Sequence, residues 1–213
     1  MLLKADKLIL QLILGSSSPA RREILAEMGY QFTIMNPDID EKAIRLEKPE
    51  DLVMALAHAK AEAIKRKLQH KCLSNKEVEG EPTLLITSDQ VMVNRGMIRE
   101  KPLNEEEARE FIKGYSGHFA VAVGYVLVTN LNTGVQRGAW DKPEIHFHEI
   151  PDEVIERVVK VRDITNVAGG FRMEHPLAAP YVKEVVGAMD SVMGLPRELT
   201  KKLLEKALEE TYA

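Results

Sequence analysis

The fold of this chain is decided by one stretch near its start, Leu12-Ile13-Leu14-Gly15-Ser16-Ser17-Ser18-Pro19-Ala20-Arg21-Arg22. An apolar run over residues 8–14 stops at a glycine and three serines, and an amphipathic segment follows over residues 23–28. This order predicts a buried strand, a loop of the size of a phosphate, and a helix. Glycine lets a ligand approach the backbone, serine can cap a helix, and Pro19 suits the first helical turn. Free N–H groups there, beside Arg21 or Arg22, would form an anion site, and an ordinary capped helix with surface arginines is the alternative.

The length and composition are those of a globular protein. A chain of 213 residues, 45% hydrophobic and 29% charged, predicts one domain, or two closely packed lobes, with a sizeable core. Its 29 basic and 33 acidic residues give a net charge of −4, so no overall field favours nucleic acid or an anionic membrane. Cys72 is the single cysteine and fits a reducing compartment. We expect a cytoplasmic protein that recognises phosphate only locally.

The N-terminus imitates a short signal peptide, because Lys4 and Lys7 precede the apolar run. Gln11 interrupts that run, and the region where cleavage would occur continues into Pro19 and two arginines. A buried first strand is therefore the preferred interpretation. No segment approaches the roughly 20 apolar residues of a transmembrane helix.

The remaining pattern alternates between strands and helices. It predicts further strands at residues 31–35, 83–93, 119–130, 135–150 and 182–186, and helices at 49–69, 104–114, 151–161 and 195–207. Residues 70–82 are polar and predict a surface loop. The alternation predicts an α/β fold, and its sheet should be mixed because residues 119–150 have the pattern of a hairpin.

Carboxylates mark two places in this pattern. Asp38, Asp40 and Glu41 share one loop, which is either a Mg²⁺ site or a solvated turn. Asp89 follows a buried apolar run, where a carboxylate is costly unless it is paired, protonated or bound to metal. We interpret Asp89 as a functional residue at the end of a strand.

Two lysines and two histidines are weaker candidates. Lys60 lies at the edge of the apolar stripe of the 49–69 helix, where a lysine usually extends into solvent. Lys101 precedes a proline, so its backbone should be extended and its side chain could point into a cleft. His146 and His148 share one strand face and could bind metal, but the exposed polar face of an edge hairpin is the preferred interpretation.

At this point the chain resembles a known family. The stretch from Ser16 to Arg22 resembles the opening motif of the Maf nucleotide pyrophosphatases. Later segments resemble that family's further signatures in order and spacing, over about residues 8–204: Asp40-Glu41, Lys60-Ala61, Ser88-Asp89-Gln90, Lys101-Pro102, Ser116-Gly117, Ala168-Gly169 and Gly194-Leu195-Pro196.

The resemblance implies an elongated mixed sheet flanked by helices, a deep central cleft, dependence on Mg²⁺ or another divalent cation, and often a homodimer. The implied reaction is hydrolysis of a nucleoside triphosphate between the α- and β-phosphates. It releases a nucleoside monophosphate and pyrophosphate.

The residues present suit that chemistry, which needs charge neutralisation and an oriented water. We expect three cations, Arg21, Lys60 and Lys101, to converge on the phosphates, with Arg22 as the alternative arginine. The Ser16 and Ser18 hydroxyls would add hydrogen-bond donors. We predict that Glu41 and Asp89 hold Mg²⁺, and the resemblance also implies that Asp89 accepts the proton of the attacking water.

The resemblance implies that substrate choice depends on Ala20, Gln90 and Glu174, the positions that separate subgroups of the family. Gln90 and Glu174, within Ser88-Asp89-Gln90-Val91 and the stretch from Ala168 to Glu174, resemble the subgroup that acts on 7-methyl-GTP. Glu174 could also accept hydrogen bonds from guanine, and its charge suits a cationic methylated base. Ala20 matches neither subgroup and removes an aromatic ring that could stack on the base. We expect a preference for 7-methyl-GTP or another modified nucleotide. The alternatives are a dTTP/UTP pyrophosphatase and a non-catalytic nucleotide-binding regulator of cell division.

Overall fold

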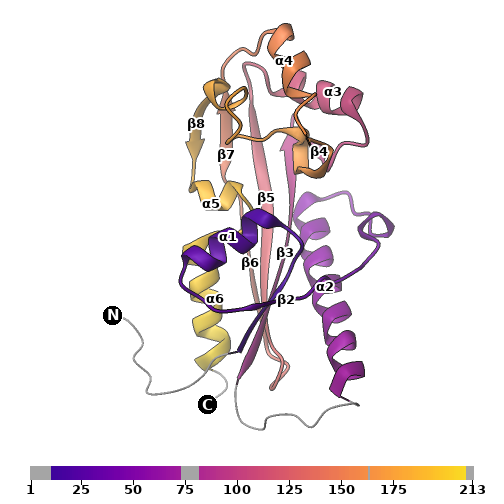
Figure 1. Cartoon of the computed structure of the whole chain (residues 1–213), viewed down its shortest axis with the longest axis vertical. Coiled ribbons are helices and arrows are strands. Elements are labelled where there is room, and N and C mark those ends of the chain that lie inside the picture. Colours follow the sequence, from indigo (N-terminus) through magenta and orange to yellow (C-terminus); the bar gives the residue numbers. More distant parts are fainter. Residues whose placement is uncertain (1–10, 73–81, 163, 210–213) are drawn as a thin grey trace.

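The computed structural model describes residues 11–72, 82–162 and 164–209. Within these ranges, eight strands form one mixed sheet, and two of them run along most of the length of an elongated molecule (Figure 1). These are β3 (Thr83–Asn94) and β5 (Phe119–Asn130), which pair antiparallel from Leu84–Asn130 to Val93–Val121. The predicted α/β fold with a mixed sheet flanked by helices is confirmed.

Shorter strands extend each half of this central pair. In one half, β1 (Gln11–Gly15) lies parallel to β3, β2 (Thr33–Ile34) lies parallel to β1, and β6 (Gln136–Asp141) pairs with β5. In the other half, β4 (Met97–Arg99) pairs with β3, β7 (Glu144–Phe147) with β5, and β8 (Val182–Val186) with β7.

One edge of β3 has a gap between its two neighbours. β1 ends at Gly15, opposite Thr87, and the pairing with β4 begins at Met92. Residues 88–91 therefore pair with no described strand on that side, while β5 continues along the other edge. Asp89 lies in this gap, inside β3, which agrees with the strand predicted over residues 83–93 but not with the interpretation of Asp89 as a strand-end residue. The backbone groups of β3 in this gap can therefore bond side chains of other elements, as Ser88 O does with Arg21 of α1.

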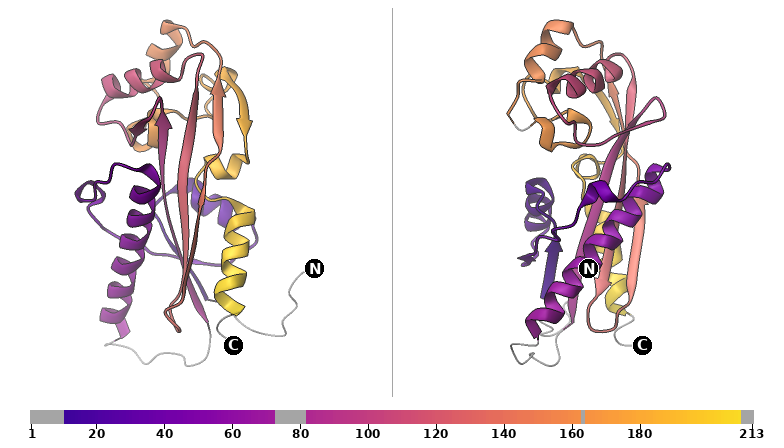
Figure 2. Two further views of the ribbon diagram at one scale, coloured as in Figure 1. Left: turned by 180° about the vertical axis from the view of Figure 1, so that it is seen from behind. Right: turned by 90° about the vertical axis from the view of Figure 1, so that its right-hand side faces the viewer.

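Helices cover both faces of the sheet, as the two further views in Figure 2 show. α2 (Pro49–Cys72) packs on one face, and α1 (Pro19–Glu27) and α6 (Arg197–Glu209) pack on the other. α3 (Glu105–Tyr115) and α4 (Asp152–Val158) cover the other half of the sheet, on the same face as α1. Leu84 and Ile86 pack in the hydrophobic cluster under α1, Met92 packs in the cluster under α3, and all three side chains project from one side of β3. α5 (Met189–Val192) follows β8, and short 3-10 turns occur at Glu41–Ala43, Ile164–Asn166, Ala168–Gly170 and Ala179–Tyr181.

Local chemistry explains where several predicted boundaries move. The strand predicted over residues 135–150 is interrupted between β6 and β7 because Pro143 has no N–H to donate to β5, although its carbonyl still accepts from Ala122 N at 2.9 Å. The strand predicted over 31–35 is reduced to β2, and α6 begins two residues later than predicted, after an unpredicted α5. Ser18 and Asn104 cap α1 and α3 through their side chains.

Residues 8–10 of the predicted first strand and most of the predicted 70–82 loop lie outside the described residues. Among the helices that the structure describes, none is both long enough and apolar enough to cross a membrane.

Candidate active site

Lys60 joins two carboxylates at the gap in the β3 edge. Its ammonium donates a hydrogen bond to Asp89 Oδ1 and lies 2.8 Å from Glu41 Oε1. The expectation that Lys60 extends into solvent is wrong, since the residue is 5% exposed. A buried ammonium is tolerated where carboxylates replace its water, and α2 places Lys60 directly over the side of β3 from which Asp89 projects.

The loop that carries Glu41 is fixed to α2. Lys67 donates to Asn36 O at 2.8 Å and forms an ion pair with Asp38, and Asp40 caps the 3-10 turn that begins at Glu41. Asp38 and Asp40 thus have the roles of a solvated turn. Of the three carboxylates in this loop, Glu41 is the one that faces the cluster.

The charges around Glu41 keep it ionised. Burial alone would raise the pKa of Glu41, but Lys60, Lys101 and Arg21 together outweigh burial and lower that pKa below its usual value. Lys101 Nζ lies 3.8 Å from Glu41 Oε2, so the exposed Lys101 side chain is directed toward the same carboxylate. Three of the predicted residues, Glu41, Lys60 and Asp89, are therefore in direct contact, and Lys101 borders them.

Arg21 is a buried cation whose direct partners are neutral. Its Nε donates to Gly194 O at 2.9 Å and its Nη1 donates to Ser88 O at 2.8 Å. Only 9% of Arg21 is exposed, so the residue is buried, yet it forms no ion pair with a carboxylate among the described residues. Burial lowers the pKa of the Arg21 guanidinium, while the charges of Asp89 and Glu41 act in the opposite direction. A buried cation in this situation is suited to bind an anion. Arg22, by contrast, is exposed to solvent.

The serine loop between β1 and α1 is shaped by its own hydroxyls. Ser16 Oγ accepts from Ser18 N at 3.1 Å, and Ser18 Oγ accepts from Arg21 N at 3.4 Å. Each hydroxyl keeps its own proton for donation. Gly15 also has a packing role, because a Cβ there would lie 2.5 Å from Ile64 Cδ1 and 2.7 Å from Thr87 Cγ2. The glycine allows close packing against α2 and β3.

The three predicted specificity residues are in different surroundings. Ala20 is partly exposed on α1, and Glu174 is exposed, with no hydrogen bond or ion pair to any described residue. Gln90 projects from the face of β3 opposite to Asp89, because successive side chains of a strand alternate. Its Nε2 donates to the carbonyls of Ser191 and Val192, each at 3.2 Å.

The carboxylates present fit a magnesium site of the kind completed by substrate. Mg²⁺ is usually held by one or two carboxylates together with phosphates and waters, and Glu41 and Asp89 supply two within reach of one ammonium. The structure describes no cluster of three or more His, Cys, Asp or Glu side chains suited to a metal. His146 lies 3.2 Å from Glu144, on the polar face of β7.

Two contributors to the site escaped prediction because they are backbone carbonyls. Ser88 O and Gly194 O hold Arg21, and every residue type carries such an acceptor, so no side-chain pattern identifies them. The signals near them were the matches at Ser88-Asp89-Gln90 and Gly194-Leu195-Pro196.

Comparison with known proteins identifies the family of this chain. Residues 11–207 match the model of the family described as Maf-like protein. A relative from Dictyostelium discoideum, named 7-methyl-GTP pyrophosphatase, is 42% identical over 92% of this chain and 96% of its own length. A protein of the same name from Vibrio parahaemolyticus is 33% identical over 87% of this chain and 90% of its own. A dTTP/UTP pyrophosphatase from Alkaliphilus metalliredigens is 29% identical, also over 87% and 90%. This chain belongs to the Maf-like protein family.

Proposed function

We propose that this protein hydrolyses nucleoside triphosphates between the α- and β-phosphates, releasing a nucleoside monophosphate and pyrophosphate. One observation carries the proposal: the buried Arg21, whose direct partners are neutral carbonyls, lies beside the Lys60–Asp89–Glu41 cluster. The names of the related pyrophosphatases support it.

The side chains divide the chemical work between them. Arg21, Lys101 and the Ser16 and Ser18 hydroxyls bind the triphosphate and offset its charge. Lys60 holds Asp89 Oδ1, while Asp89 Oδ2 has no hydrogen-bond partner among the described residues. Asp89 Oδ2 is therefore the atom that accepts the proton of the attacking water. Mg²⁺, held by Glu41 and Asp89, supplies further neutralisation of phosphate charge when it is bound.

The substrate that we propose is 7-methyl-GTP or another modified nucleotide. Glu174 is the carboxylate offered to the base: it is exposed and has no protein partner among the described residues. A carboxylate can accept two hydrogen bonds from the N–H groups of guanine, and its negative charge suits a methylated, cationic ring. A pyrimidine would leave those oxygens unpaired. The dTTP/UTP relatives make the pyrimidine nucleotides the alternative substrates.

A product assay tests the reaction. Purified protein with Mg²⁺ is offered 7-methyl-GTP, GTP, UTP, dTTP and CTP, and pyrophosphate and monophosphate are quantified. Asp89→Asn should lower kcat by about 100- to 10,000-fold, the usual contribution of a general base, and should still bind nucleotide. Asp152→Asn, which removes a carboxylate from the exposed ion pair with Lys113, is the matched control and should retain activity.

The possible results distinguish the role of Asp89, the role of Glu174 and the hypothesis of a non-catalytic regulator. Unchanged hydrolysis in Asp89→Asn would contradict the role of Asp89. A preference for UTP or dTTP would keep the reaction and contradict the role of Glu174. Nucleotide binding without hydrolysis of any substrate would favour the regulator. The cytoplasmic location, the deep cleft and the homodimer remain predictions from the sequence.

A further inference from the structure

We propose that residues 191–194, which form the end of α5 and the turn after it, position Arg21 for the substrate phosphates. Gln90 and Gly194 then act as positioning residues in this unit rather than as base contacts. We call these four residues the 191–194 segment. The proposal deepens the proposed function, on which it rests in taking Arg21 as a phosphate ligand.

The segment fixes one side of the Arg21 guanidinium. Gly194 O accepts from Arg21 Nε at 2.9 Å and from Ser88 Oγ at 3.3 Å, and Ser88 O accepts from Arg21 Nη1 at 2.8 Å. A guanidinium is planar and carries five N–H donors. With Nε and Nη1 held from two elements, the direction of Nη2 is determined, and Nη2 has no partner among the described residues. Such a held fork is suited to paired phosphate oxygens.

Gln90 holds the segment on the sheet. Its Nε2 lies 3.2 Å from both Ser191 O and Val192 O, so both amide hydrogens are used. Gln90 also faces α5, on the side of β3 opposite to the Lys60–Asp89 pair. It therefore has no amide hydrogen left to donate to a base, and its effect on the substrate passes through the segment to Arg21.

Gly194 is required by both conformation and space. Its φ is +99°, a region that side-chain-bearing residues rarely adopt. A Cβ there would lie 2.8 Å from Gln90 Oε1, 3.2 Å from Arg21 Nε and 3.3 Å from Arg21 Nη2. Any side chain at this position would displace the two groups that the segment aligns.

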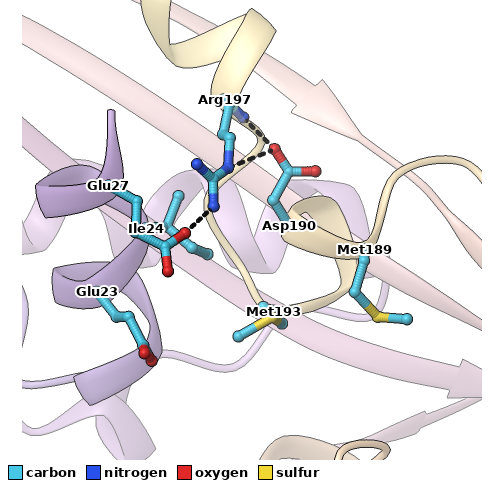
Figure 3. Close-up of a pocket in the computed structure, with 7 residues that line it drawn as sticks. All are labelled: Glu23, Ile24, Glu27, Met189, Asp190, Met193 and Arg197. Carbon is cyan, nitrogen blue, oxygen red and sulfur yellow. Dashed lines mark hydrogen bonds and ion pairs between the residues drawn. The ribbon is translucent and has the colours of Figure 1, made fainter. Parts of the chain in front are cut away.

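Ion pairs tie the same corner from outside. Figure 3 shows Arg197, at the start of α6, between Glu27 of α1 and Asp190 of α5. Arg197 N also donates to Asp190 Oδ2 at 2.8 Å. A cavity of about 390 Å³ opens beside these groups, lined also by Glu23, Ile24, Met189 and Met193. α1, which carries Arg21, is thus joined to the α5 region twice: by the Arg21–Gly194 hydrogen bond and by the ion pairs of Arg197.

The experiment uses a ligand that has phosphates and no base. Binding of tripolyphosphate in the presence of Mg²⁺ is measured by calorimetry for the wild type, Gln90→Leu, Gln90→Glu and Gly194→Ala, each also combined with Arg21→Ala. We expect each single variant to bind tripolyphosphate at least about tenfold more weakly than the wild type. In the Arg21→Ala background the same changes should weaken binding little further, because the effects of coupled residues are not additive. Thermal melting checks that each variant is folded.

Two matched controls separate the segment from general effects. Gln136→Leu makes the same change at a glutamine of β6 that bonds Thr129 Oγ1. Gly134→Ala places a side chain at another residue of positive φ, +78°, where an added Cβ would meet nothing within 4 Å. It therefore introduces backbone strain away from Arg21. Both should bind tripolyphosphate as the wild type does.

The base dependence gives the deciding readout. If Gln90 acts through Arg21, Gln90→Leu raises KM by one common factor for every nucleotide hydrolysed and leaves their order of preference unchanged. An altered preference with unchanged tripolyphosphate binding would make Gln90 a base contact and overturn the proposal, as would losses that add fully to that of Arg21→Ala. A wild type that binds tripolyphosphate but hydrolyses no nucleotide would contradict the proposed function alone.

Discussion

At the scale of residues, the site depends on one buried ammonium. Lys60 contacts both Asp89 and Glu41, and removal of one member of a buried charge group leaves the others uncompensated. The sequence places Lys60 beside an apolar stripe and offers no reason to bury it. Its burial follows from two carboxylates that reach it from β3 and from the 36–48 loop.

Glu41 should make the stability of the protein depend on pH. Because the pKa of Glu41 is lowered in the folded state, the unfolded chain binds more protons at this residue as the pH falls. The stabilising effect of Glu41 is therefore complete above the ordinary glutamate pKa of about 4.3 and is lost as the pH falls through the lower, folded value. Urea unfolding of the wild type and Glu41→Gln between pH 3 and 7 would measure this.

The stability difference between the two proteins should shrink toward the acid end. Glu47→Gln, an exposed change in the same loop, is the control and should show no such trend. A difference between wild type and Glu41→Gln that is constant over the whole range would contradict the lowered pKa.

At the scale of elements, a chain of hydrogen bonds links α3 to the segment that carries Lys101. The buried Tyr115 hydroxyl donates to Gly169 O at 2.9 Å, and Gly169 N donates to Glu100 O at 2.9 Å. Burial raises the pKa of Tyr115 above its usual value, so the phenol remains a donor at physiological pH. Lys101 is the next residue after Glu100, and its backbone is thereby fixed from within the core.

Tyr115→Phe should destabilise the protein by about 1–3 kcal/mol, because it leaves the buried Gly169 carbonyl without its donor. Urea denaturation measures the loss. Tyr125→Phe is the matched control, since Tyr125 is 6% exposed and its hydroxyl forms no hydrogen bond with a described residue. Equal losses in the two variants would show that removal of a buried hydroxyl, and not loss of the hydrogen bond to Gly169, sets the change in stability.

At the scale of the whole molecule, β3 and β5 connect its two halves. Each strand has twelve residues, and both contribute side chains to the clusters under α2, under α1 with α6, and under α3 with α4. The sequence left open whether the chain forms one domain or two closely packed lobes. Strands shared by all three clusters favour a single cooperative unit.

Unfolding should therefore occur in one transition. Trp140 is the single tryptophan, and its Nε1 donates to Glu50 O at 3.1 Å, so its fluorescence reports the contact between β6 and α2. Far-UV circular dichroism reports all helices, including α3 and α4 in the other half. Coincident urea transitions from the two probes are expected for two-state unfolding. Separate midpoints would indicate two lobes that unfold independently.

The sequence by itself determined the features that depend on neighbouring residues. The strand, serine loop and helix at residues 12–22 and the long helix from Pro49 are present in the structure as predicted, and Ser18 and Asn104 cap their helices. Each arises from local periodicity, from a side chain that bonds the next turn, or from a proline at a permitted position. The order of elements also sufficed for the mixed sheet.

The tertiary structure alone decided how those elements use their side chains. In the tertiary structure Arg21, and not Arg22, is buried beside the carboxylates, and Lys60 is buried as well. Asp89 and Gln90 lie on opposite faces of β3. The tertiary structure also brought Gly194 O to Arg21, across 173 positions of sequence. These outcomes depend on contacts between distant segments and on backbone carbonyls that every residue carries, and a linear pattern encodes neither.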